Sequence, residues 1–468
     1  MGPLSRRVAV AILAGALGCD PGGPVPDAAV PADAAADGPS DAGSLDAAGG
    51  LDGSPGVDAG GDSGDAALAT DASPGEDGGG LPVECEQADD FAIPADPEGL
   101  VTGAGTAART GGFVVAWTMV DGIESFIRAR LLDDCGVPEG GEIAVDVSGL
   151  VVGTPVVTAV GGTDDFAIAW SREDGDGDGA GVVFQRFGSD GSASGDEAVA
   201  NDVTFDDQIA SSAVALPSGF ALAWTDFSAG VLVRPDAVMA SFDETGEPTS
   251  GEFAVSPVQD GSQELPLLAA LGDGGLLAAW TDGGWTPLAR RRDAVGGWTD
   301  AAALQIAELD AHAVATGAAA DGSSLAVGLT RFDADDAGDA EIALVTADGD
   351  VVSLISIAAV AGVAERGVQV AGLPGGGWLV AWTDDSERGA PLAEDASGTT
   401  VRGAKVDSEG TPLGASFVIP TTIDFDQELA AAAAGEGGTL LVWTDASRAG
   451  GDRDGGLRAR LVPDELGR

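Results

Sequence analysis

The sequence predicts an all-β fold built from seven copies of one unit, and three observations support that prediction. First, residues 377–384 read GWLVAWTD, and related stretches recur as GFVVAWT, DFAIAWS, GFALAWTD, GLLAAWTD, SLAVGLT and GTLLVWTD. Second, the copies follow one another at intervals of 53, 54, 56, 49, 53 and 61 residues. Third, each unit has room for four strand-like runs separated by turn residues. Seven such units are typical of a seven-bladed β-propeller of four-stranded antiparallel blades.

One position of the repeat is occupied by the same large aromatic residue in six of the seven copies. These residues are Trp117, Trp170, Trp224, Trp280, Trp382 and Trp443, and Leu329 takes the place in the fifth copy. The chain contains nine tryptophans, so most of them lie at this one position. We expect each ring to pack between neighbouring units, because a large aromatic side chain is most stable when it is buried.

The second unit illustrates how the runs are recognised. Its four runs are expected at residues 155–161, 165–171, 181–188 and 197–201. The second run alternates Phe, Ile and Trp with Ala, so both faces are apolar, as in a strand buried on both sides. Gly and Asp cluster between the runs, where turns require them. Small residues dominate the first run of several units, which predicts that these runs crowd toward a common axis.

The last unit lacks a fourth strand, and a matching segment stands at the other end of the domain. Residues 90–94 (DFAIP) match residues 252–256 (EFAVS) and 416–420 (SFVIP), which are fourth strands. We therefore expect the N-terminal strand to complete the last blade and close the ring. Closure would leave no exposed sheet edges, whereas an open solenoid would not need a divided unit.

The N-terminus has the features of an export signal. Arg6 and Arg7 precede an apolar run at residues 8–17, which is too short to span a bilayer as a mature helix. The residues that follow end in Cys19, and the sequence ALGC resembles the lipobox of bacterial lipoproteins, although Ala16 stands where that family usually has Leu. The resemblance implies that Cys19 becomes the lipidated first residue of the mature protein. The alternative is an ordinary cleaved signal with an incidental Cys. In either case the export route is open between the general and the twin-arginine pathway.

A long low-complexity segment follows the signal. Residues 20–83 consist almost wholly of Asp, Ala, Gly, Pro and Ser, and no Lys or Arg occurs between Arg7 and Arg109. Such a segment has too little to bury and repels itself, so it is expected to be a disordered tether. The predicted organisation is therefore a signal at residues 1–19, a tether at residues 20–83 and a propeller at residues 84–468.

Taken together, these features resemble bacterial lipoproteins that carry a tethered β-propeller with GFVVAWTD-type repeats. The resemblance covers the signal and about residues 85–468. It implies a lipid-anchored protein of the cell envelope. An outer-membrane or cell-surface location is favoured, and the inner membrane is the alternative. It supplies no catalytic residues. The repeat differs from that of WD40 proteins, because no Gly-His signature accompanies the Trp-Thr-Asp sequence.

The charge balance restricts function. The formal net charge is −56, from 77 acidic and 21 basic residues, so binding to a phosphate backbone is excluded. One His and no Tyr leave little scope for acid–base catalysis through those side chains. We therefore predict a non-enzymatic module that binds an unknown protein or glycan. The alternatives are a carboxylate-dependent hydrolase acting on polysaccharide and a purely structural envelope lipoprotein.

Two small groups of residues are candidate sites. Asp174, Asp176 and Asp178 alternate with Gly between the second and third strands of the second unit, a spacing that suits Ca²⁺, and the alternative is a solvated acidic turn. Cys85 and Cys135 both precede fourth strands, in blades that would be neighbours where the ring closes. An exported protein can form a disulfide there, and the alternative is two separate thiols.

Overall fold

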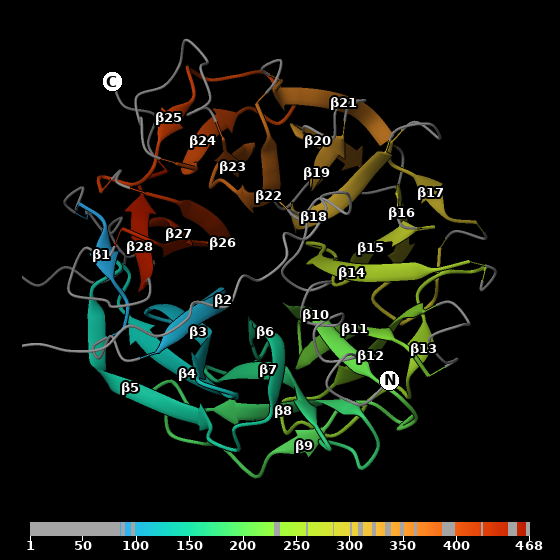
Figure 1. Ribbon diagram of the computed structural model, residues 1–468. Coiled ribbons are helices and arrows are strands. Elements are labelled where there is room, and N and C mark those ends of the chain that lie inside the picture. The colour runs from blue at the N-terminus through green and yellow to red at the C-terminus, as the bar shows by residue number, and fades with distance from the viewer. Residues whose placement is uncertain are drawn as a thin grey trace, which may run out of the picture. The chain divides into compact units, whose positions relative to one another are not determined.

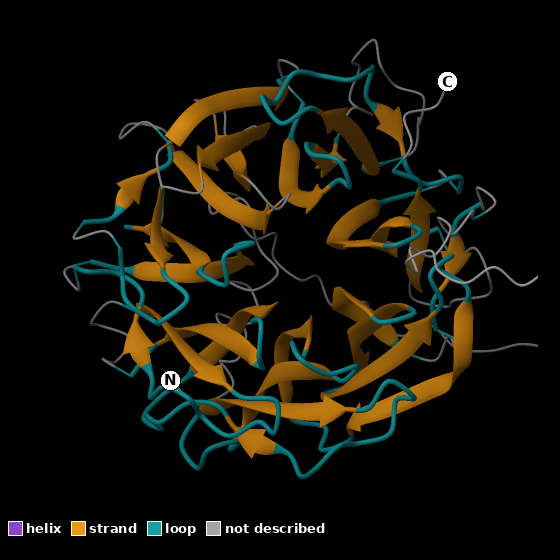
Figure 2. Ribbon diagram, turned by 180° about the vertical axis from the view of Figure 1, so that it is seen from behind, coloured by secondary structure: helices purple, strands orange, loops and turns teal. Residues whose placement is uncertain are grey.

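Seven four-stranded antiparallel sheets surround a central channel in the computed structural model of the protein (Figure 1). The described residues contain strands and loops but no helix (Figure 2). They are residues 85, 89–94 and 99–464, except 229–234, 259–260, 284, 300–301, 308–311, 321–323, 333–337, 347–350, 360–362, 386–397, 423–424 and 448–455. The predicted signal, with Cys19, and the predicted tether lie outside them. The architecture confirms the predicted seven-bladed propeller.

The first four blades run consecutively along the chain. Blade 1 contains β2 (Leu100–Arg109), β3 (Gly112–Asp121), β4 (Glu124–Leu132) and β5 (Pro138–Asp146). Blade 2 contains β6 (Val151–Ala159), β7 (Phe166–Glu173), β8 (Ala180–Phe187) and β9 (Ala198–Val199). Blade 3 contains β10 (Gln208–Ala215), β11 (Phe220–Asp226), β12 (Asp236–Phe242) and β13 (Phe253–Ala254). Blade 4 contains β14 (Gln263–Ala270), β15 (Leu276–Asp282), β16 (Thr286–Arg292) and β17 (Leu304–Gln305).

The last three blades complete the ring. Blade 5 contains β18 (His312–Ala320), β19 (Ser324–Phe332), β20 (Gly338–Thr346) and β21 (Val351–Ala358). Blade 6 contains β22 (Glu365–Gly372), β23 (Trp378–Asp384), β24 (Thr400–Val406) and β25 (Phe417–Val418). Blade 7 contains β26 (Gln427–Gly435), β27 (Gly438–Asp445), β28 (Gly456–Val462) and, from the other end of the domain, β1 (Phe91–Ala92). The first strands lie nearest the channel and the fourth strands at the rim (Figure 1).

The second strand of each blade is buried on both faces, as its composition predicts. In β11 every residue is buried. Phe220, Leu222 and Trp224 pack against blade 2, whereas Ala221 and Ala223 pack against blade 4. The alternation of large and small side chains therefore gives each blade one bulky face and one flat face, so that neighbouring blades fit together.

The repeated tryptophan position forms the centre of every contact between blades. Trp224 belongs to a core shared with Val182 and Phe184 of the preceding blade. Trp117 belongs to the equivalent core with Leu440 of blade 7, so the same contact also closes the ring. All six tryptophans and Leu329 are at most 1% exposed. The structure thus places them between neighbouring units, as expected.

In five of the seven blades the Ser or Thr after the tryptophan position makes a hydrogen bond to the next blade. The Thr118 hydroxyl donates to the carbonyl oxygen of Gly153 at 2.8 Å. The hydroxyl oxygen of Thr225 accepts from the Leu265 N–H at 3.0 Å, and that of Thr383 accepts from the Leu429 N–H at 3.0 Å. The first strands are irregular at these points, because their pairing register shifts there. These irregularities were not predicted, and they explain why β6 begins four residues before the expected run.

The N-terminal strand closes the ring, as predicted. Phe91 and Ala92 pair with Ala459 and Arg458 of β28, and the Ile93 N–H donates to the Leu457 carbonyl oxygen at 2.9 Å. The fourth strands are short throughout most of the ring, and β9 pairs with β8 through two residues only. The closing strand is therefore held by few main-chain hydrogen bonds and needs other contacts.

Asp90 supplies such contacts, which the sequence did not reveal. Its carboxylate accepts from the main-chain N–H groups of Thr421 at 2.6 Å and Thr422 at 2.9 Å. It also pairs with the Arg458 guanidinium, and the Asp90 side chain is 1% exposed. Since Thr421 and Thr422 follow the fourth strand of blade 6 and Arg458 lies in blade 7, one side chain fixes the closing strand to two blades.

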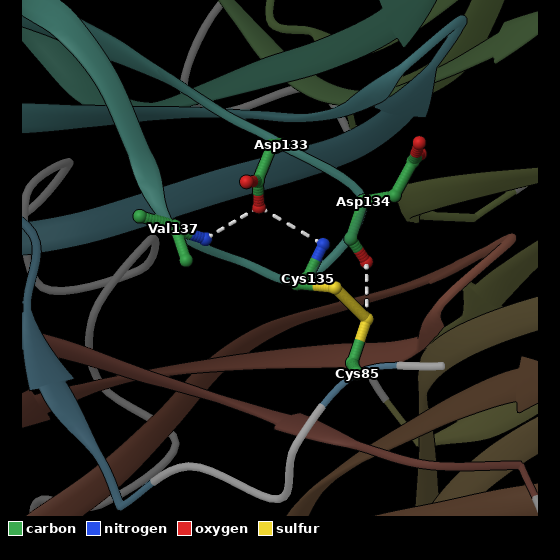
Figure 3. Close-up of a disulfide and its surroundings, with 5 residues drawn as sticks. All are labelled: Cys85, Asp133, Asp134, Cys135 and Val137. Atoms are coloured by element: carbon green, nitrogen blue, oxygen red, sulfur yellow. Dashed lines mark hydrogen bonds between the residues drawn. A yellow bond between two sulfur atoms is a disulfide. The ribbon is translucent and has the colours of Figure 1, made fainter. Parts of the chain in front are cut away.

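A disulfide joins Cys85 to Cys135 beside this closure (Figure 3). The two Cα atoms lie 5.3 Å apart, within the range that a disulfide requires. The Asp133 carboxylate accepts from the N–H groups of Cys135 at 2.9 Å and Val137 at 2.8 Å, which orders the loop between β4 and β5 (Figure 3). The bond therefore links the segment before β1 to blade 1, across the seam from blade 7.

Reduction of this disulfide is expected to lower the free energy of unfolding by about 2–4 kcal/mol, because the bond restricts the unfolded chain across a separation of 50 residues. Denaturant unfolding with and without a reductant measures the change. The matched control is the double variant Cys85→Ser, Cys135→Ser, whose unfolding should not respond to the reductant. Identical curves for the parent protein in both conditions, or two reactive thiols in the denatured and unreduced chain, would contradict this expectation.

Candidate functional site

The central channel contains a cavity of about 420 Å³ that is lined by the first strands of all seven blades. Small residues line much of it, as the sequence predicts for segments near the axis. At Gly105 an added Cβ atom would lie 2.5 Å from the Pro155 carbonyl oxygen, and at Gly317 it would lie 2.8 Å from that of Val368. Larger side chains at these two positions would force neighbouring blades apart, so the channel keeps its width through glycine.

Most hydroxyl groups of the cavity lining are already used by the backbone. Thr106 donates to the Val114 carbonyl oxygen at 3.0 Å, and Ser211 donates to that of Ile209 at 3.2 Å. The Ser212 hydroxyl oxygen accepts from the Leu268 N–H at 3.0 Å. The first two bonds each lie within one blade, whereas the bond to Ser212 joins blade 3 to blade 4. Together these groups give the cavity wall a mixed polar and apolar character.

Glu264 is the single charged residue among the described residues that line the cavity. It is the second residue of β14, and its neighbour Gln263 is fully buried and donates to the Asp282 carboxylate at 2.9 Å. Burial raises the pKa of the Glu264 carboxyl group, and a hydrogen bond with Ser262 offsets this effect only in part. In the part of the chain that the structure describes, no Arg or Lys lies within ion-pair distance of it.

The equivalent residue of blade 7 has a different environment, although its local sequence is the same. Glu264 and Glu428 both follow a buried Gln and precede a Leu, and they pair in register with Thr281 and Thr444. Glu428 forms an ion pair with Arg366 of the preceding blade at 3.2 Å. In blade 3, which precedes Glu264, the residue that corresponds to Arg366 is Ile209. The Glu264 carboxylate therefore lacks an arginine partner at this position.

The backbone beside Glu264 adopts a conformation that is uncommon for its residue type. Leu265 has a φ of 54°, in the left-handed region, where the equivalent residues of blades 2 and 6 are Gly153 and Gly367 with φ of 78° and 64°. Such a conformation costs roughly 1–2 kcal/mol for a residue with a side chain. It persists because the Leu265 N–H donates to Thr225 and the register of β14 shifts at this point. Strain of this kind is frequent at functional sites.

One face of the ring exposes most of the large apolar side chains. We call it the connection face, because it carries the loops between successive blades and the hairpins between second and third strands. Nine of the fourteen exposed large hydrophobic residues among those described lie on it, namely Leu100, Ile123, Val147, Leu150, Val203, Phe205, Val258, Trp285 and Phe425. Single exposed apolar residues are normal, but their concentration on one face is typical of an interaction surface.

The cavity reaches this same face. Glu264 lies where β14 begins, and the first strands of all blades begin at the connection face. Thr225 and Phe227, at the end of the second strand of blade 3, also line the cavity. The exposed apolar residues therefore surround the side of the ring from which a ligand would approach Glu264.

The candidate calcium loop lies between β7 and β8, as predicted. Asp176 turns toward the fourth strand of its blade and accepts from the Asn201 side-chain amide at 2.5 Å. It also accepts from the Asp178 N–H at 3.3 Å, while Asp174 has a φ of 55°. Among the described residues, no three acidic, His or Cys side chains gather in an arrangement that could hold a metal ion. Calcium binding by Asp174, Asp176 and Asp178 stays a prediction.

Comparisons with known proteins assign neither a family nor a function to this chain. No protein-family model and no curated protein matches the chain. Among solved structures, the chain is similar to the β-propeller domain of the Trilobed protease from Pyrococcus furiosus, at 9% identity over 80% of this chain and 97% of that one, with a TM-score of 0.44.

Two further solved structures are similar at the same level. One is an α-L-arabinofuranosidase from Fusarium graminearum, at 11% identity over 68% of this chain and 98% of that one, with a TM-score of 0.46. The other is a Hadza microbial sialidase, at 14% identity over 60% of this chain and 63% of that one, with a TM-score of 0.43. Similarity this low assigns neither a ligand nor an activity. No helix capable of crossing a bilayer occurs within the described ranges.

Proposed function

We propose that the protein is a non-enzymatic binding module of the bacterial cell envelope, anchored to the membrane through lipidated Cys19, and that it engages its partner at the connection face. The observation that supports this proposal most strongly is the coincidence of two features on one face. Exposed Phe205 and Phe425, each 59% exposed, lie on the same face as the opening of the channel beside Glu264. Aromatic residues at the surface are typical anchors of binding sites.

A hydrolase that uses paired carboxylates is the less favoured alternative. Glycoside hydrolysis of this type requires two carboxyl groups on either side of the bond to be broken. Among the described residues that line the cavity there is one, Glu264. The cavity therefore supports binding better than this reaction.

Capture from the envelope fraction of the source cell tests the proposal. The tagged full-length protein is expected to retain a partner, and the double variant Phe205→Ser, Phe425→Ser is expected to lose it. The matched control is Val137→Ser, Val295→Ser, because those residues are 57% and 92% exposed on the opposite face. Equal retention by both double variants, or no retention by the parent protein, would contradict the proposed role of the connection face.

A further inference from the structure

We propose that the central channel binds a small organic cation, whose ammonium or guanidinium group pairs with Glu264 while its apolar portion lies along the channel wall. This inference deepens the proposed function, since it names a ligand class for the channel that opens onto the connection face. Three observations support the inference: the size of the cavity, the distribution of charge around the cavity, and the fixed position of Glu264.

The cavity has the size and lining of a small-molecule site. Its volume of about 420 Å³ lies within the range of about 300–1,000 Å³ that such sites usually occupy. Its wall near Glu264 includes Ile209, Leu265 and Leu267, and Phe227 lies at the same end. Sites of this kind combine an apolar wall with a small number of polar groups that fix the orientation of the ligand.

The charges around the channel favour a cation. Glu264, Arg366 and Glu428 occupy equivalent positions in the first strands of blades 4, 6 and 7, and these positions form a ring around the channel. Within this ring, Arg366 and Glu428 neutralise each other through their ion pair at 3.2 Å. The corresponding residues of blades 2 and 3 are Val152 and Ile209, which carry no charge. Glu264 therefore gives this ring of described residues a net negative charge, inside a concave site where electric fields are concentrated.

The carboxylate of Glu264 would gain a partner from such a ligand. Burial raises its pKa, because removal from water disfavours the charged form and the hydrogen bond with Ser262 compensates only in part. An ammonium or guanidinium group within hydrogen-bond distance would stabilise the charged form. Glu428 of blade 7 has such a partner within the protein, Arg366 of blade 6, whereas the corresponding residue before Glu264 is the apolar Ile209 of blade 3.

The backbone holds Glu264 in a defined position. Leu265 is fixed in the left-handed region by its hydrogen bond to Thr225 of the preceding blade, and Pro266 follows it directly. A carboxylate on a rigid, strained turn can be aligned with a ligand without a further loss of conformational entropy on binding. An acidic residue on a mobile surface loop would lack this property.

Three probes of matched size test the inference by isothermal titration calorimetry on the purified full-length chain. Hexylammonium is expected to bind, hexanol to bind at least tenfold more weakly, and hexanoate not to bind. The variant Glu264→Gln should weaken hexylammonium at least tenfold. Glu409→Gln is the matched control, because it changes the net charge equally at an exposed turn between β24 and β25, on the opposite face.

The outcomes separate this inference from the proposed function. If hexanol binds as tightly as hexylammonium, or if Glu264→Gln and Glu409→Gln behave alike, the channel is an apolar cavity without charge recognition and the inference is wrong. If no probe binds although envelope capture depends on Phe205 and Phe425, the connection face functions without a cation site in the channel. If capture fails but hexylammonium binds through Glu264, the cation site in the channel is supported and the proposed binding of an envelope partner is contradicted.

Discussion

Replacement of Asp90 with alanine is expected to lower the free energy of unfolding by about 3–5 kcal/mol, the range observed when one partner of a buried ion pair is removed. The Asp90 and Arg458 side chains are only 1% and 11% exposed, and the carboxylate also accepts from the N–H groups of Thr421 and Thr422. The variant would leave these groups without their acceptor and would loosen the strand that closes the ring.

Denaturant unfolding measures this effect, and the adjacent residue provides the control. Asp89 is exposed, so Asp89→Ala removes the same charge one position earlier and should change stability by less than about 0.5 kcal/mol. Equal losses in the two variants would show that net charge, and not the closure contact, is responsible.

The contribution of Asp90 should also depend on pH. Burial alone would raise the pKa of this carboxyl, but hydrogen bonds from Thr422, Arg458 and Thr421 outweigh it and lower the pKa below its ordinary value. A group with a lowered pKa stabilises the folded state fully above its unfolded pKa of about 3.9, and this contribution is lost as the pH falls through the folded value. The difference between the parent protein and Asp90→Ala should therefore shrink below about pH 4.

The second large effect is expected at the repeated tryptophan position. Replacement of Trp224 with alanine should lower the free energy of unfolding by about 3–5 kcal/mol, because the ring is fully buried between blades 2 and 3 and its removal leaves a cavity. Unfolding followed by circular dichroism measures the loss. A change of less than 1 kcal/mol would contradict the role assigned to this contact.

A more conservative pair of variants separates packing from hydrogen bonding at this position. The Trp170 indole N–H donates to the buried carboxylate of Asp146 at 2.7 Å, whereas the Trp224 indole N–H has no acceptor within the described part of the protein. Trp170→Phe would remove a donor from a buried carboxylate, and Trp224→Phe would remove a buried donor that is not satisfied. Trp170→Phe should therefore be the more destabilising, and the reverse order would contradict this assignment.

The repeat made the fold predictable. The alternation in residues such as Phe220 and Trp224 marks a strand buried on both sides, and the match between residues 90–94 and the other fourth strands indicated that β1 completes blade 7. These features follow from local sequence, so they can be read from each copy separately.

The contacts between distant blades could not be predicted in the same way. Asp90 bonds to residues more than 330 positions away along the chain, and nothing near it in the sequence indicates that pairing. Asp176 turns toward Asn201, which follows the fourth strand of the blade, and a reading of the acidic loop alone does not show this contact. Glu264 was not singled out from the sequence, because its neighbours along the chain are the same as those of Glu428. The two residues differ in the preceding blade, which carries Ile209 before Glu264 and Arg366 before Glu428. An alignment of the units would have shown this difference.

The position of the disulfide determines how the ring would respond to mechanical force. Cys85 precedes Asp90 and β1 along the chain, and its bond to Cys135 anchors that point to blade 1. Tension applied from the N-terminal side reaches Cys85 first and passes through the disulfide into the loop between β4 and β5. The two-residue closing strand then bears no load in the oxidised protein, whereas in the reduced protein the same tension would act directly on β1 and peel it from β28.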